Sequence, residues 1–155
     1  GQTATDQDVR APRSRPHSAR QETALLMDNV RKCLVVDDAS VVRKVARVLI
    51  EDHRFEVTEA EDARTALDMC KSEMPELILL DWHMPGLSPL DFLATLRAMG
   101  GAKRPFVLYM ATEIDVNERA KASRAGADAY LLKRSARQSL EAKLAEIPAA
   151  ALAVA

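Results

Sequence analysis

Residues 77–81 read Leu-Ile-Leu-Leu-Asp and open the longer stretch LILLDWHMPG, residues 77–86. Four consecutive apolar residues are too few for a helix and are typical of a strand that is covered on both faces of a parallel sheet. The run ends on a carboxylate, Asp81, and an unpaired buried carboxylate is energetically costly. We therefore expect Asp81 to lie where its charge is used.

Similar apolar runs recur along the chain and alternate with helical patterns. The expected strands cover residues 33–36, 55–60, 77–80, 106–110 and 130–132. The run at 55–60 alternates apolar and polar residues, which is typical of a strand near a sheet edge. Apolar residues at helical spacing predict four helices, within 42–49, 63–70, 88–99 and 140–147, and the polar stretch 117–124 is also expected to be helical. Five alternating strands and helices predict an α/β fold, a five-stranded parallel doubly wound sheet.

Length and composition favour one ordinary domain. The chain has 155 residues, 48% of them apolar, and its formal net charge is −1. This balance gives no reason to expect binding to nucleic acid or to a membrane. We expect a disordered extension at 1–29, a folded domain at 30–147 and a C-terminal tail at 148–155. Cys33 and Cys70 have no partner at metal-ligand or redox spacing, so we expect reduced core thiols in a cytoplasmic protein.

Charged residues follow three of the predicted strands. Asp37 and Asp38 follow the first strand, Asp81 the third and Lys133 the fifth. Because ligands of open parallel sheets bind beyond the carboxyl ends of the strands, we expect these four side chains to meet. Like charges this close favour a bound cation, and oxygen ligands suit Mg²⁺ or Mn²⁺. A carboxylate beside such an ion is also a plausible nucleophile toward phosphorus.

The same residues carry a family resemblance. The acid pair, Asp-x-x-Met-Pro at 81–85 and AGADAYLLK at 125–133 resemble, in this order, the motifs of response-regulator receiver domains of two-component signalling. The resemblance covers about residues 31–147 and implies a flavodoxin-like (βα)5 fold. It also implies that Asp81 is the phosphoacceptor, that Lys133 pairs with it and then with the phosphoryl group, and that Tyr130 is the switching aromatic residue.

The resemblance further implies a magnesium site. Asp38, Asp81 and the backbone carbonyl of His83 would bind Mg²⁺ directly, and Asp37 would act through bound water. In this family the position of His83 also tunes the lifetime of the phosphoryl group. For this chain, an exposed loop histidine with only its carbonyl engaged is the preferred interpretation.

The sequence departs from the family pattern at three positions. The hydroxyl residue that usually ends the fourth strand is Ala111, and either the next residue, Thr112, replaces it or the coupling hydroxyl is missing. Pro89, four residues after the Pro of Met-Pro, stands where the family usually has a glycine. Arg134 replaces the usual proline after Lys133, so we predict a trans bond there, because a cis bond before a residue other than proline costs about 2.5–4 kcal/mol. We also expect Ser135 to cap the last helix and Lys133 still to reach Asp81.

These features predict a single-domain response regulator. A sensor histidine kinase or a phosphotransfer protein would phosphorylate it, and it would signal by docking to a downstream protein rather than by acting as an enzyme. One alternative is a degenerate receiver that docks without phosphate. A Mg²⁺-dependent phosphohydrolase of the haloacid-dehalogenase type is a remote alternative, because that chemistry needs a second carboxylate where this chain has His83.

Overall fold

The computed structural model describes residues 31–113 and 115–147. These residues form the five predicted strands and five helices in the predicted order. The elements are β1 (Arg31–Val36), α2 (Ser40–Glu51), β2 (Phe55–Ala60), α3 (Ala63–Ser72), β3 (Leu77–Asp81), α4 (Pro89–Ala98), β4 (Phe106–Ala111), α5 (Val116–Ala125), β5 (Ala129–Leu132), the 3-10 helix η1 (Lys133–Ser135) and α6 (Ala136–Glu146).

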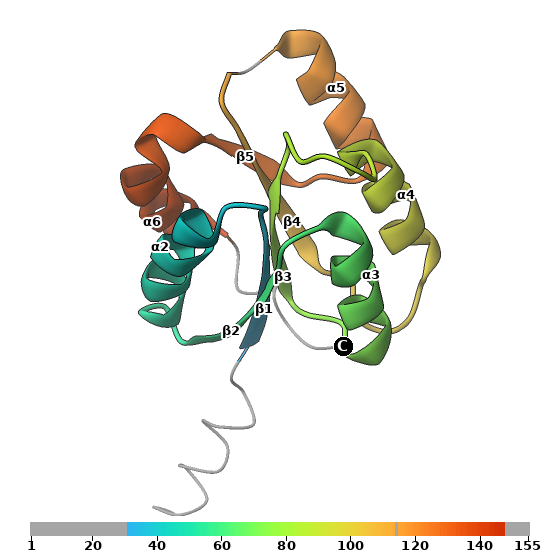
Figure 1. The fold of residues 1–155 in the computed structure, drawn as a ribbon, viewed down its shortest axis with the longest axis horizontal. Coiled ribbons are helices and arrows are strands. Elements are labelled where there is room, and N and C mark those ends of the chain that lie inside the picture. Colours follow the sequence, from blue (N-terminus) through green and yellow to red (C-terminus); the bar gives the residue numbers. More distant parts are fainter. Residues whose placement is uncertain (1–30, 114, 148–155) are drawn as a thin grey trace, which may run out of the picture. The chain divides into compact units, whose positions relative to one another are not determined.

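All five strands are parallel and lie in the order β2-β1-β3-β4-β5. The predicted doubly wound sheet is therefore confirmed, and β2 is an edge strand as its alternating pattern indicated. Helices α2 and α6 cover one face of the sheet, and α3, α4 and α5 cover the other (Figure 1). The chain reverses its direction of winding after β2, so the carboxyl ends of β1 and β3 flank the topological switch point, where ligands bind in such folds.

The central strand β3 is buried on both faces, as its continuous apolar sequence predicted. Residues Leu77 to Leu80 have no exposed surface. Leu77 and Leu79 pack in the core beneath α2 and α6, whereas Ile78 and Leu80 pack in the core beneath α3, α4 and α5. The strand extends one residue beyond the predicted run, so that Asp81 is its last member. The backbone of Asp81 is thus held in the sheet, in register with Met110 of β4.

Local signals explain where α4 and α5 begin and end. The Ser88 hydroxyl accepts a hydrogen bond from the Asp91 N–H at 3.1 Å, and Pro89 occupies the first helical position, as predicted. Asp115 caps α5 with its side chain. Gly126 ends α5 at φ 114°, and a Cβ there would lie 2.8 Å from Nε of Arg97, so glycine is required.

The start of α6 differs in part from the prediction. Ser135 occupies the N-cap position, but its side chain makes no capping hydrogen bond. With ψ at 26° its backbone is not extended as in a usual N-cap, and its hydroxyl instead lies 3.0 Å from the Ser139 hydroxyl. The described residues contain no cis peptide bond, so the predicted trans bond between Lys133 and Arg134 is confirmed.

The predicted extension at 1–29 and the predicted tail at 148–155 both lie outside the described residues. None of the described helices is long and apolar enough to span a bilayer.

Candidate functional site

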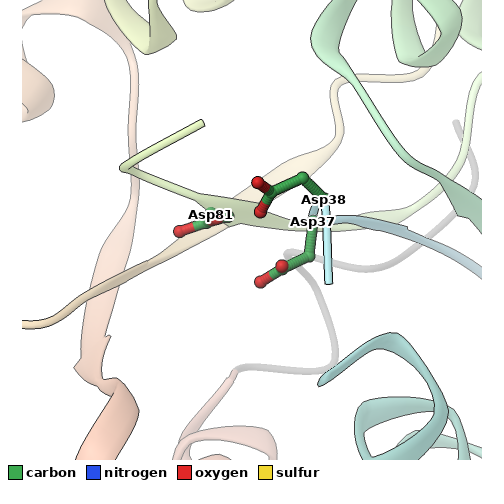
Figure 2. Close-up of side chains that lie close together, drawn as sticks. All are labelled: Asp37, Asp38 and Asp81. Carbon is green, nitrogen blue, oxygen red and sulfur yellow. The ribbon is translucent and has the colours of Figure 1, made fainter. Parts of the chain in front are cut away.

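Three carboxylates meet beyond the carboxyl ends of β1 and β3. Asp37 and Asp38 directly follow β1, Asp81 ends β3, and these two strands are neighbours that pair up to Val36 and Leu80. One carboxylate oxygen from each acid lies within 4.8 Å of the others. Figure 2 shows the three side chains together, two from the loop after β1 and one from β3. The predicted convergence of these acids is confirmed.

The two acids that follow the strands most closely are fully buried. Asp37 and Asp81 are 0% exposed, whereas Asp38 is exposed. Atom Oδ2 of Asp37 and Oδ2 of Asp81 have no hydrogen-bond partner among the described residues. Burial raises the pKa of Asp37, and the neighbouring Asp81 and Asp38 raise it further, against lowering effects of the Ala39 N–H and Lys133. The site therefore holds more buried negative charge than its own hydrogen bonds stabilise.

Among the described residues, Lys133 is the one cation that contacts both buried acids. Its Nζ atom lies 2.8 Å from Oδ1 of Asp81 and 3.5 Å from Oδ2 of Asp37. Burial lowers the pKa of Lys133, but the hydrogen bond to Asp81 and the charge of Asp37 outweigh this, so that the pKa is raised overall. The predicted approach of Lys133 to Asp81 is confirmed although the peptide bond after Lys133 is trans.

Backbone groups fix the orientation of each buried carboxylate. The Ala39 N–H donates to Oδ1 of Asp37 at 2.8 Å, and the His83 N–H donates to Oδ1 of Asp81 at 3.2 Å. In both acids Oδ1 accepts a backbone hydrogen bond and Oδ2 accepts none from the described residues, although Oδ2 of Asp37 lies 3.5 Å from the Lys133 ammonium. His83 thus contributes its N–H to the site, and the metal-binding role of its carbonyl stays a prediction.

The donor set fits a hard divalent cation. Two buried carboxylate oxygens without hydrogen-bond partners and an exposed third carboxylate offer only oxygen ligands, which suit Mg²⁺ or Mn²⁺ and not zinc. A cation between them would relieve the mutual repulsion that one lysine leaves in place.

The structure places the predicted hydroxyl candidates at the end of β4. Ala111 is the last residue of β4, is buried and pairs in register with Leu132. Thr112 follows the strand, is exposed and lines a polar pocket together with His83, and no described residue forms a hydrogen bond with its side chain. Ala111 is thus the residue that ends the fourth strand, while the choice between Thr112 and a missing hydroxyl stays a prediction.

Tyr130 contacts residues that sequence reasoning missed. Its ring centroid lies 5.9 Å from that of Tyr109, which in turn lies 4.6 Å from that of Trp82. Arg119 and Lys143 approach the Tyr130 ring at 4.8 and 5.6 Å. The alternation of β4 could have indicated Tyr109, because it places this residue on the same face as Val107 and Ala111.

A groove between α2 and α6 opens beside the site and was also missed. Its cavity volume is about 280 Å³, and its lining includes Val41, Val45, Lys133, Arg134 and Arg137. On α2, Val41, Val45 and Val48 are 71%, 43% and 59% exposed. Their spacing of four and three residues places them on one helix face, and this spacing was a readable signal of a second, exposed apolar stripe.

A doubly wound parallel sheet with three acids and a lysine beyond its carboxyl edge defines a flavodoxin-like α/β protein with an acidic cluster at the switch point of its sheet. Comparison with known proteins gives the family. Residues 33–145 match the family model described as "Response regulator receiver domain", and the chain therefore belongs to this family of two-component signalling proteins.

Two curated relatives and one solved structure illustrate the match. Chemotaxis protein CheY-3 of Vibrio cholerae is 35% identical over 125 residues, which is 80% of this chain and 95% of the relative. Chemotaxis protein CheY of Pseudomonas aeruginosa is 35% identical over 117 residues, 75% of this chain and 94% of the relative. The structure of Vibrio cholerae CheY4 superimposes with a TM-score of 0.71 at 25% identity and covers 77% of this chain and 99% of that one.

These comparisons confirm the family that the motifs indicated and the fold that it implies. Receiver domains bind Mg²⁺ at an acidic pocket, and CheY-like receivers are generally signalling modules rather than enzymes. The roles of the individual site residues in this chain remain predictions.

Proposed function

We propose that this chain is a response regulator that accepts a phosphoryl group on Asp81 and signals by phosphorylation-dependent docking. The observation that carries the proposal is the environment of Asp81, a fully buried carboxylate with one unpartnered oxygen beside Lys133 and two further acids. Such a surplus of buried negative charge is energetically costly unless a cation or ligand compensates it. Asp81 also lies at the switch point of the sheet, where ligands bind in such folds.

The proposed reaction transfers one phosphoryl group. A carboxylate oxygen of Asp81 forms a bond to phosphorus, and the bond from phosphorus to the donor breaks, so that the electron pair leaves with the donor group. The product is an aspartyl phosphate. Asp38, Asp81 and the His83 carbonyl would hold Mg²⁺ directly and Asp37 through water, and the ion would neutralise charge on the phosphoryl oxygens. Lys133 would move from its ion pair with Asp81 to a phosphoryl oxygen as a point charge.

The proposed donor is a sensor histidine kinase or a histidine phosphotransfer protein. The groove between α2 and α6 supports a protein donor, because its apolar walls reach the site at Lys133. Arg134 and Arg137 line it as well, so a helical donor with apolar and acidic side chains would fit. The downstream protein and the cytoplasmic location stay predictions from the sequence.

Labelling with acetyl phosphate tests the phosphoacceptor. We expect one labile phosphoryl group per chain, detected by intact mass and formed only with Mg²⁺ or Mn²⁺. Asp81→Asn should abolish the label, whereas Asp68→Asn, which removes an exposed acid of α3, should keep it. Equal labelling of Asp81→Asn would refute the assignment.

One observation favours a second candidate, a receiver that docks without phosphate. Ala111 puts a methyl group at the end of β4 where the family usually has a hydroxyl. Such a protein would bind its partner with equal affinity in its unphosphorylated and acetyl phosphate-treated forms, which separates it from the leading proposal.

A further inference from the structure

We propose that Arg43, oriented by Glu59, is a positioning residue that holds the loop of Asp37 and Asp38 in its cation-binding shape. This inference deepens the proposed function and rests on it for the identity of the ion. Neither residue belongs to the acid cluster, and Arg43 reaches the site only through the backbone of Asp37.

Arg43 bridges two separate elements with its guanidinium group. One nitrogen, Nη1, donates to the backbone carbonyl of Asp37 at 2.7 Å. Its Nε donates to Oε1 of Glu59, the penultimate residue of β2, at 3.0 Å. The side chain of Arg43 is 16% exposed and that of Glu59 is 23% exposed, so both bonds are partly shielded from water. A planar group with fixed donor directions is suited to holding two acceptors at a defined angle.

The register of the sheet explains why Glu59 lies within reach. Glu59 pairs with Val35 of β1, two residues before Asp37, and it lies on the sheet face covered by α2. Arg43 and Arg47 are one turn apart on α2, so both point to this carboxylate. Arg47 Nε donates to Oε2 of Glu59 at 2.7 Å, but Arg47 makes no hydrogen bond to the loop. Glu59 thus links the helix to the strand, and only Arg43 extends the link to Asp37.

The hydrogen bond from Arg43 is one of three that hold Asp37 in place. The Asp37 N–H donates to the Ala60 carbonyl at 3.1 Å, the Asp37 carbonyl accepts from Arg43, and Oδ1 of Asp37 accepts from the Ala39 N–H. Three of the polar groups of Asp37 are therefore engaged in hydrogen bonds, and Oδ2, which lies 3.5 Å from Lys133 Nζ, has no hydrogen-bond partner among the described residues. Without Arg43 the carbonyl loses its partner, and the peptide unit between Asp37 and Asp38 becomes free to rotate. Both carboxylates would then lose their defined positions.

Charge alone makes the opposite prediction. A guanidinium group close to the acids repels a divalent cation, so its removal would strengthen cation binding if only charge mattered. Positioning predicts weaker binding, because groups that orient metal ligands typically change metal affinity by about 10–100-fold. Arg47 offers a matched control, since it carries the same charge on the same helix and contacts Glu59 but not the loop.

Mg²⁺ titration followed by Trp82 fluorescence separates the two predictions. We expect Arg43→Met to bind Mg²⁺ about tenfold more weakly than the wild type. Arg47→Met should bind within about twofold of the wild type, and Glu59→Gln should weaken binding by a smaller factor than Arg43→Met. Unchanged or tighter binding by Arg43→Met, or equal weakening by Arg47→Met, would overturn the proposal.

Amide hydrogen exchange in the metal-free protein supplies a readout that needs no ion. The Ala39 N–H, which donates to Asp37, should exchange faster in Arg43→Met than in the wild type and stay unchanged in Arg47→Met. If Arg43→Met does not fold, the same comparison between Glu59→Gln and Arg47→Met decides. Unchanged exchange at Ala39 would overturn the positioning role. A wild type that does not respond to Mg²⁺ would instead contradict the proposed function.

Discussion

Adjacent acids of the site have unequal surroundings. Asp37 is buried, accepts a hydrogen bond from the Ala39 N–H and lies 3.5 Å from the Lys133 ammonium, whereas Asp38 is exposed. Part of the charge of Asp37 is thus already neutralised, and its position is fixed by the loop. The Asp38 carboxylate stays fully available, which agrees with its predicted role as a direct ligand.

We therefore expect Asp38→Asn to weaken Mg²⁺ binding more than Asp37→Asn, by about tenfold in the first case and less in the second. The asparagine keeps the shape of each side chain and removes only its charge. Trp82 fluorescence during Mg²⁺ titration measures both affinities, and a thermal melt without Mg²⁺ checks that each variant is folded. Equal Mg²⁺ affinity in both variants and the wild type would be incompatible with the assignment.

The end of β4 carries a second residue-scale question, the missing hydroxyl. Ala111 ends the strand and is buried, and Thr112 is exposed beyond it. We expect Thr112→Ala to leave the response of Tyr130 to phosphorylation unchanged and Ala111→Thr to strengthen it, because only position 111 lies within the strand ladder. Nuclear magnetic resonance shifts around Tyr130, with and without a phosphoryl mimic at Asp81, measure the response.

Overpacking is the main risk of Ala111→Thr, since inserting atoms at a buried position costs about 1–3 kcal/mol. Ala111→Ser adds the hydroxyl with less volume and serves as its control. A lost response in Thr112→Ala would show instead that Thr112 supplies the hydroxyl.

At the scale of elements, α2 is tied to β2 by a small ion-pair network. Both oxygens of Glu59 are engaged, one by Arg43 and one by Arg47. The hydrogen bond from Arg47 holds the pKa of Glu59 below its usual value, and Arg43 lowers it further, against a raising effect of burial. The network is partly exposed, so we expect its contribution to be roughly 0.5–1 kcal/mol.

The sign of this pKa shift predicts a pH dependence. Because the folded pKa of Glu59 is depressed, its stabilising effect is fully present above the unfolded-state pKa of about 4.5 and is lost as the pH falls through the folded pKa. Glu59→Gln should therefore be less stable than the wild type at pH 7, and this difference should shrink on acidification below about pH 4.5. Urea unfolding at several pH values measures it. A difference that is constant with pH would contradict the assignment.

The elements themselves were largely predictable, because burial imposes a periodicity on the sequence. The apolar run of β3 and the alternation of β2 indicated a central and an edge strand, and the structure confirms both. The cap of α6 was predicted less well. Serine is a common N-cap, but Ser135 is also the last residue of the 3-10 turn, and its backbone angle places the hydroxyl next to that of Ser139. Such a detail depends on the three-dimensional path of the loop.

The candidate site was predictable to the extent that strand ends determine it. Asp37, Asp81 and Lys133 each follow an apolar run, and parallel strands bring their ends to one edge. Arg43 and Glu59 lack such a signal, because a charged residue on a helix or an edge strand is usually only solvated. Their connection depends on the register of β1 and β2 and on the orientation of α2, which a sequence pattern does not specify.

At the scale of the whole molecule, the site lies between two different surfaces. On one side the groove between α2 and α6 reaches Lys133. On the other side, an aromatic row leads from Trp82, next to Asp81, through Tyr109 to Tyr130 on β5. The sheet order accounts for this row, because β3, β4 and β5 are successive neighbours. Trp82 directly follows β3, Tyr109 lies on β4 and Tyr130 lies on β5.

The aromatic row predicts a role for Tyr109 in communication across the molecule. Its ring contacts both of the others, and aromatic pairs of this kind contribute about 0.5–1.5 kcal/mol each beyond area burial. A change at Asp81 that shifts Trp82 would therefore be felt at Tyr130 through Tyr109. We expect Tyr109→Leu to preserve labelling of Asp81 by acetyl phosphate and the fluorescence response of Trp82, but to reduce the resonance shifts at Tyr130.

Tyr109→Phe is the matched control, because it keeps the ring and removes only the hydroxyl. It should respond like the wild type, since the row depends on ring contacts. A normal Tyr130 response in Tyr109→Leu would mean that the signal travels through the backbone of β4 and β5 instead. A reduced response in Tyr109→Phe would assign the coupling to the tyrosine hydroxyl, a group whose burial already raises the pKa of Tyr109. The two substitutions together thus determine whether ring packing, the hydroxyl or the sheet itself connects the phosphoacceptor to the β5 surface.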